Sequence, residues 1–147
     1  MLALGGCSSH HHHGMMESGK SDAYWQKGQQ DMAGLIDRTV KDPAKATQVK
    51  TLVGEIVTEL KAGREQERAA HRQLYTLNAS YTASAEEFTK VMDEANNQRM
   101  KTSAKILSLR FKMKELMTAD EWKALSDQML SYSSKYQHGS AGAKTGY

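Results

Sequence analysis

The sequence predicts an all-α protein in which two long helices form an antiparallel hairpin flanked by two shorter helices. Aromatic residues make up only 7% of the chain and there is a single proline, so residues typical of strands and turns are scarce. The mean hydropathy of -0.68 indicates a thin core and a large surface. Long helices in a hairpin, and a dimer of such hairpins, fit this composition better than a spherical domain does.

The chain divides into one helical domain and two tails. We expect residues 1–22 to hold a lipidation site and a flexible spacer rich in His and Met, residues 23–136 to form the domain, and residues 137–147 to be a loose tail. A first helix is predicted over residues 23–40. Asp42-Pro43 then ends it, because proline suits the first turn of a new helix but not a helix interior. The apolar side of this helix consists of Trp25, Met32, Leu35 and Ile36.

A second, long helix is predicted over residues 43–77, followed by a loop at residues 78–82. Ser84, with Glu87 three residues later, is the capping box that starts a third helix. Apolar residues of the third helix recur at steps of three and four, which is the pattern of a heptad seam. Arg99 and Thr102 form a polar layer within it, of the kind that sets register or partner choice. The seam comprises Ala85, Phe88, Met92, Ala95, Arg99, Thr102, Ile106, Leu109, Met113 and Leu116.

A second capping box, Thr118 with Glu121, predicts a fourth helix with Trp122, Leu125 and Met129 facing inward. The third helix is roughly 50 Å long at 1.5 Å per residue. The second helix has a similar length and a short loop joins the two, so they are expected to lie antiparallel. Met92 and Met113 are seam residues, and a Met-rich inner face also suits adaptable binding of apolar segments.

Leu4-Gly5-Gly6-Cys7 resembles the site at which bacterial lipoprotein signal peptidase cleaves, after which the cysteine is acylated. We therefore expect Cys7 to carry lipid and to tether the chain on the periplasmic side of the cell envelope, with the outer membrane favoured because Ser8 follows. The preceding residues lack the basic segment and most of the apolar run of a signal peptide, so its true start stays open. The alternative is an incidental cysteine in a flexible start.

His10, His11, His12 and His13, followed by Met15 and Met16, form the one cluster with metal-ligand chemistry. Imidazoles bind Zn²⁺, Ni²⁺ or Cu²⁺, and thioethers favour Cu⁺. Four consecutive histidines cannot all face one ion, so any such site is expected to be weak. A solvated spacer or a tag remnant is the alternative, and no cofactor is required.

Several functional classes find no support in the sequence. A single cysteine excludes internal disulfides, and no apolar run is long enough to span a bilayer. Lys and Arg exceed Asp and Glu by only 20 to 17 and do not interleave with aromatics, which argues against nucleic acid. No phosphate loop, catalytic pairing or H-E-x-x-H motif is present, so we do not expect an enzyme.

The order of elements resembles the CpxP/Spy/ZraP group of envelope proteins, whose hallmark is the LTxxQ motif. The segment MTADEW at residues 117–122 resembles the second copy, with Met for Leu and Glu for Gln. DPAKATQ at residues 42–48 occupies the place of the first copy, and RAAHRQL at residues 68–74 is similar to the basic, His-containing run of the family's first long helix. The resemblance implies a hairpin protomer that forms a homodimer and a role in chaperoning, in restraint of a stress sensor, or in metal sensing.

These observations favour a non-catalytic lipoprotein that binds unfolded clients or a sensor domain. Two alternatives stay open. The seam could join a partner protein, which would make the chain a structural or adaptor subunit of an envelope assembly, or the histidines could make it a metal-binding lipoprotein.

Overall fold

The computed structural model describes residues 18–139 and, within them, the side chains of residues 22–131. This part of the chain forms four helices: α1 (Ser18–Thr39), α2 (Pro43–Ala79), α3 (Ala85–Leu116) and α4 (Ala119–Gly139). No strand occurs among these residues, so the all-α prediction is confirmed.

The helix bounds differ from the predicted ones at three ends. α1 begins at Ser18, within the expected spacer, and Asp22 in its second turn forms an ion pair with Lys61 of α2 (3.6 Å). α2 continues through Ala79 into the expected loop, and α4 continues to Gly139. α4 extends to Gly139 because no proline or glycine, the residues that commonly end a helix, precedes Gly139 in its second half.

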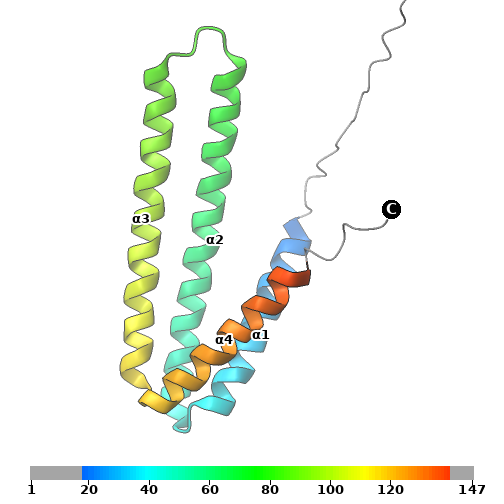
Figure 1. Cartoon of the computed structure of the whole chain (residues 1–147), viewed down its shortest axis with the longest axis vertical. Helices are drawn as coiled ribbons and strands as arrows, with labels where there is room; N and C mark the ends of the chain where they lie inside the picture. The colour runs from blue at the N-terminus through cyan, green and yellow to red at the C-terminus, as the bar shows by residue number, and fades with distance from the viewer. Residues whose placement is uncertain (1–17, 140–147) are drawn as a thin grey trace, which may run out of the picture.

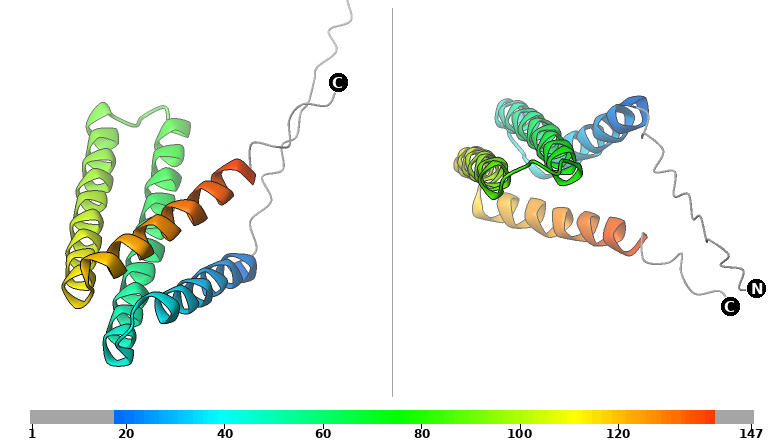
Figure 2. Two further views of the ribbon diagram at one scale, coloured as in Figure 1. Left: turned by 60° about the horizontal axis from the view of Figure 1, so that its bottom comes forward. Right: turned by 90° about the horizontal axis from the view of Figure 1, so that it is seen from above.

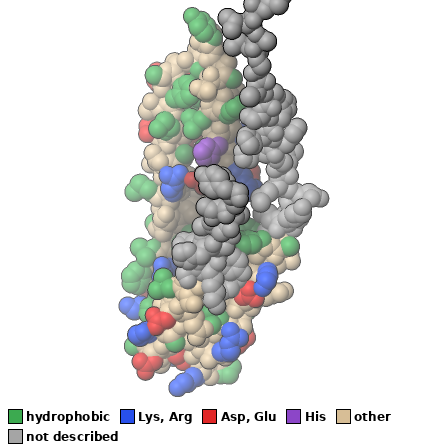
Figure 3. Space-filling view, turned by 45° about the vertical axis from the view of Figure 1, so that its right-hand side comes forward, with side chains coloured by type: hydrophobic (Ala, Val, Ile, Leu, Met, Phe, Trp, Pro, Cys, Tyr) green, Lys and Arg blue, Asp and Glu red, His purple; other side chains and the backbone are tan. Residues whose placement is uncertain are grey.

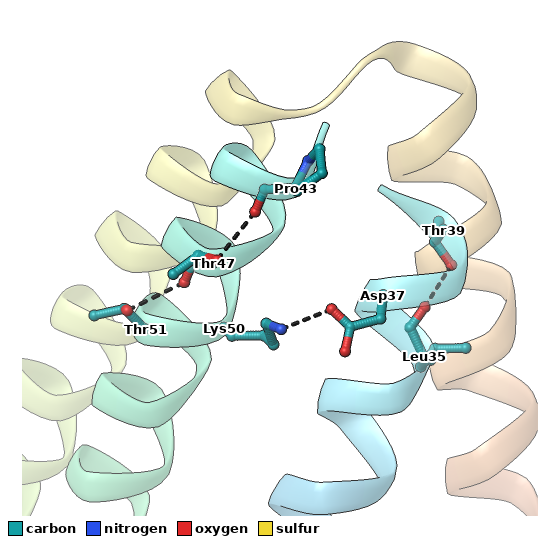
Figure 4. A network of polar contacts seen from close by, with 7 residues as sticks. All are labelled: Leu35, Asp37, Thr39, Pro43, Thr47, Lys50 and Thr51. Carbon is teal, nitrogen blue, oxygen red and sulfur yellow. Dashed lines mark hydrogen bonds and ion pairs between the residues drawn. The ribbon is translucent and has the colours of Figure 1, made fainter. Parts of the chain in front are cut away.

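The turn between α1 and α2 forms at Asp42. Its carboxylate accepts hydrogen bonds from the backbone N–H groups of Ala44 (2.9 Å) and Lys45 (3.3 Å) and so caps α2, which begins at Pro43 as the sequence predicts. The ammonium of Lys50 pairs with Asp37 at 2.6 Å and joins the two helices across this turn (Figure 4). Threonine hydroxyls on both helices donate to carbonyls one turn earlier.

Both predicted capping boxes are present. Ser84 caps α3, and its backbone N–H donates in return to the Glu87 carboxylate (2.8 Å). At the start of α4, the Thr118 N–H donates to Glu121 (2.9 Å) and the Glu121 N–H donates to the Thr118 hydroxyl (3.2 Å). Glu121 also accepts from the Lys41 N–H (2.9 Å), which ties α4 to the α1–α2 turn.

The core lies at the end of the molecule where all four helices meet. Its buried side chains come from every helix, and Leu125 and Ile36 are almost completely enclosed. Leu109 is buried in α3 as well. The buried cluster comprises Leu35, Ile36, Val40, Ala46, Val49, Met113 and Leu125.

α2 and α3 continue side by side well beyond this core, and Figures 1 and 2 show them leaving it as a two-helix arm. α1 packs against the lower half of α2, as far as Lys61 and Arg64, while α4 diverges from the arm (Figure 2). Ion pairs join α2 to α3 at Glu59–Lys105 and at Glu67–Arg99 (2.9 Å). No described helix is both long enough and apolar enough to cross a bilayer.

The expected seam of α3 is buried only near the core. Leu109 and Met113 are buried, whereas Ile106 is half-buried and Met92 is 53% exposed. Met129 of α4, expected to face inward, is 39% exposed. Away from the core, α3 packs against α2 alone. A contact between two helices leaves the side chains at both of its edges open to solvent, so the seam residues there are not buried.

Candidate binding surface on the two-helix arm

The two helices of the arm are packed loosely against each other. Between residues 50 and 108 no side chain is buried, so the contact between α2 and α3 consists of half-buried residues. Large apolar side chains also lie exposed along the arm and at its tip: Leu60, Tyr75, Tyr81, Met92, Met100 and Leu107. In the space-filling view, hydrophobic side chains reach the surface of the upper arm, while charges of both signs gather at the lower end (Figure 3).

A recess of about 230 Å³ lies between α2 and α3 near the middle of the arm. Gly63 and Thr102 face each other there, and a Cβ placed on Gly63 would lie 3.3 Å from the Thr102 methyl group. The glycine therefore allows the close approach of the two helices at this level. The remaining lining residues are Leu60, Arg64, Gln66, Glu67, Ala95, Gln98, Arg99, Ser103 and Ile106.

Charged groups border this recess on the α2 side and the α3 side. Arg99, the predicted polar layer, is 63% exposed and its guanidinium pairs with Glu67 at 2.9 Å. The guanidinium of Arg64 lies 4.8 Å from the ring centre of Trp25 in α1, a cation–π distance. The middle of the arm thus combines apolar lining residues with charged groups.

A second recess of about 530 Å³ lies closer to the tip of the arm. Its apolar floor is formed by Leu77 and Val91, and its rim carries both positive and negative side chains. The mid-arm recess and this second recess are therefore alike, because both are bordered by positive and negative side chains. The rim consists of Arg72, Gln73, Thr76, Glu87, Lys90 and Glu94.

The structure separates the three residues predicted for the binding surface. Met92 and Arg99 are exposed on the arm, but Met113 is only 3% exposed and packs in the core. Met113 is buried, as its seam position predicts, and the binding role of these three residues stays a prediction. Glu67, the partner of Arg99, was missed because nothing local marks a contact between residues 32 positions apart.

The other predicted site residues lie outside the described residues. They are Cys7 and the four histidines His10, His11, His12 and His13. His71 of α2, within the RAAHRQL segment, is exposed. Among the side chains that the structure describes, no three His, Cys, Asp or Glu groups lie together in a way that could hold a metal ion.

Comparison of the chain with protein-family models, with curated proteins and with solved structures gives no match.

Proposed function

We propose that this protein is a non-catalytic binding protein of the cell envelope, similar in role to the CpxP/Spy/ZraP group. The arm of α2 and α3 would bind unfolded clients or a sensor domain. The observation that supports this most is the long stretch, residues 50–108, without a buried side chain. A helix pair that serves only its own stability would be expected to bury its apolar residues more fully.

Methionine and leucine side chains on the arm suit such binding. Leu60 lines the mid-arm recess and is exposed, and Met92 is exposed on α3 three residues before the lining residue Ala95. The flexible thioether of methionine adapts to ligands of different shape. Neighbouring charges keep the apolar surface soluble while the arm is unoccupied. A homodimer of hairpins would join two such arms into one larger surface.

Suppression of client aggregation tests this role. Two unrelated, heat-labile proteins should scatter less light on heating when the full chain is present, and the double substitution of Met92→Gln with Leu60→Gln should weaken the suppression several-fold. Leu130→Gln is the matched control, because Leu130 is 70% exposed but lies on α4. The protein would instead be an adaptor if it suppressed the aggregation of neither client and copurified with one partner at fixed stoichiometry.

The location in the envelope is tested separately. Lipid on Cys7 should make protein expressed with its native upstream region partition into detergent, and Cys7→Ser should release it. An unmodified Cys7 in membrane-derived material, seen by mass spectrometry, would refute the lipid anchor without affecting the result on clients.

A further inference from the structure

α3 carries a second apolar stripe on the side that faces away from α2. Met100, Ala104, Leu107 and Phe111 follow one another at steps of four, three and four residues, which places them on one face of a helix with 3.6 residues per turn. All four are exposed; the exposed fractions of Met100, Leu107 and Phe111 are 72%, 54% and 57%. We call this row the outer stripe.

The outer stripe lies opposite the residues with which α3 packs inward. At 100° per residue, Leu109 and Met113 point almost to the other side of the helix. They are the two buried residues of α3. α3 lies at the edge of the molecule, with α2 between it and α1 (Figures 1 and 2). Single exposed apolar residues need no explanation, but three large ones in a row over three helical turns indicate a contact surface.

Basic residues flank the outer stripe on both sides. Lys101 and Lys112 lie along one edge, which also carries the acidic Glu115, and Arg110 and Lys114 lie along the other, so the basic residues outnumber the acidic one by four to one. All four are exposed, and none forms an ion pair with a side chain that the structure describes. We call these residues the basic flanks. Positive charge on both sides of an apolar row complements a surface that is apolar inside and negative outside.

Two other occupants fit less well. If two copies of α3 paired antiparallel with their outer stripes in register, Met100 would meet Phe111, and Lys101 would then lie near Lys112 of the other copy, which charge repulsion opposes. A peptide helix docks into a groove. Met100, Leu107 and Phe111 do not line the recesses between α2 and α3, because they lie on the opposite side of α3.

We propose that the outer stripe and the basic flanks dock on the surface of an anionic lipid bilayer. Met100, Leu107 and Phe111 would enter the boundary between headgroups and acyl chains, while the basic side chains would reach the phosphates, as in interfacial amphipathic helices. A straight helix edge can lie along a flat membrane, and the mid-arm recess stays outside this contact. This docking is independent of lipid on Cys7 and of client binding.

Flotation with vesicles tests the proposal on the full chain carrying Cys7→Ser, so that an anchor makes no contribution. The protein should float with vesicles of equal parts phosphatidylglycerol and phosphatidylcholine, and much less with pure phosphatidylcholine. Lys112→Gln with Lys114→Gln should lower the partition coefficient by about fivefold for each lysine, which corresponds to ~1 kcal/mol per residue. Leu107→Gln with Phe111→Gln should lower it by on the order of tenfold.

Matched controls carry the same substitutions elsewhere. Tyr75→Gln changes a residue of α2 that is 78% exposed, and Lys45→Gln with Lys90→Gln removes two exposed lysines away from the outer stripe. Both controls should float like the parent, and circular dichroism should show equal helicity in all variants. Equal flotation of the Leu107/Phe111 variant and the parent would overturn the proposal.

Two further results would also overturn it. Binding to a soluble Glu- and Leu-rich helical peptide without binding to vesicles would assign the surface to an acidic protein. Conversion of a dimer to a monomer by Leu107→Gln with Phe111→Gln, measured by light scattering, would assign it to a second copy of the chain.

Discussion

At the residue scale, Glu121 connects segments that are far apart in the chain. Its two carboxylate oxygens accept hydrogen bonds from the backbone N–H groups of Lys41 and Thr118, both at 2.9 Å. The hydrogen bond from Lys41, followed by that from Thr118, lowers the pKa of Glu121 below its ordinary value of 4.5. The ionised carboxylate therefore stabilises the junction of α1, α2 and α4.

Glu121→Gln should lower the melting temperature at neutral pH, because a single amide oxygen cannot replace both carboxylate oxygens. A pKa lowered by folding contributes stability that is complete above the unfolded pKa near 4.5 and is lost as the pH falls through the lower, folded pKa. The difference in melting temperature between parent and variant should thus shrink below about pH 4.5. Thermal melts monitored by circular dichroism measure it, and a difference independent of pH would contradict the role of the charge.

Leu109 and Leu107 are two leucines of α3 in opposite environments, 4% and 54% exposed. Leu109→Ala should lower the free energy of unfolding by about 2–4 kcal/mol, the range for buried aliphatic side chains. Leu107→Ala is the internal control and should change it by less than about 0.5 kcal/mol. Ile106, which the seam pattern places in the same class as Leu109, is half-buried, so Ile106→Ala should fall between the two. Urea denaturation gives all three values, and equal losses would refute this order.

At the element scale, substitution of Arg99 tests whether its ion pair is needed to hold α2 and α3 together along the arm. Its ion pair with Glu67 is solvent-exposed, and such pairs are worth about 0–1 kcal/mol. Arg99→Leu should therefore hold or raise stability, because a leucine adds apolar contact with α2. Urea denaturation measures the change, and loss of the folded state in this variant would show that the ion pair is required. Light scattering on the same variant would reveal any effect on partner or register choice.

The arm and the core differ in how their helices are stabilised. Core helices are held by buried side chains from all four elements, whereas the arm relies on half-buried contacts and ion pairs. Local opening should for this reason be easier in the arm than at the core, as expected where few apolar contacts are buried. An arm of this kind can adjust to ligands without loss of the fold.

At the scale of the whole molecule, the histidine segment tests whether metal binding and folding are coupled. Deletion of His10, His11, His12 and His13 should abolish weak Zn²⁺ or Ni²⁺ binding, which in the parent should strengthen as the pH rises through the histidine pKa of about 6.5. Melting temperature and helicity should not change. Calorimetric titration and thermal melts provide the readouts. A lower melting temperature after deletion would place the histidines in a structured site.

The sequence by itself determined the helices, and only the tertiary structure decided which of their faces are covered. Asp42, Ser84 with Glu87, and Thr118 with Glu121 act on backbone groups two or three residues away, so local pattern was sufficient to predict where α2, α3 and α4 begin. The exposure of Met92 and the Glu67–Arg99 ion pair depend instead on how many helices pack at each level. Heptad spacing predicts which residues share a face, but burial also needs a third layer, and among the described residues the side chains of α2 and α3 are buried only at the core.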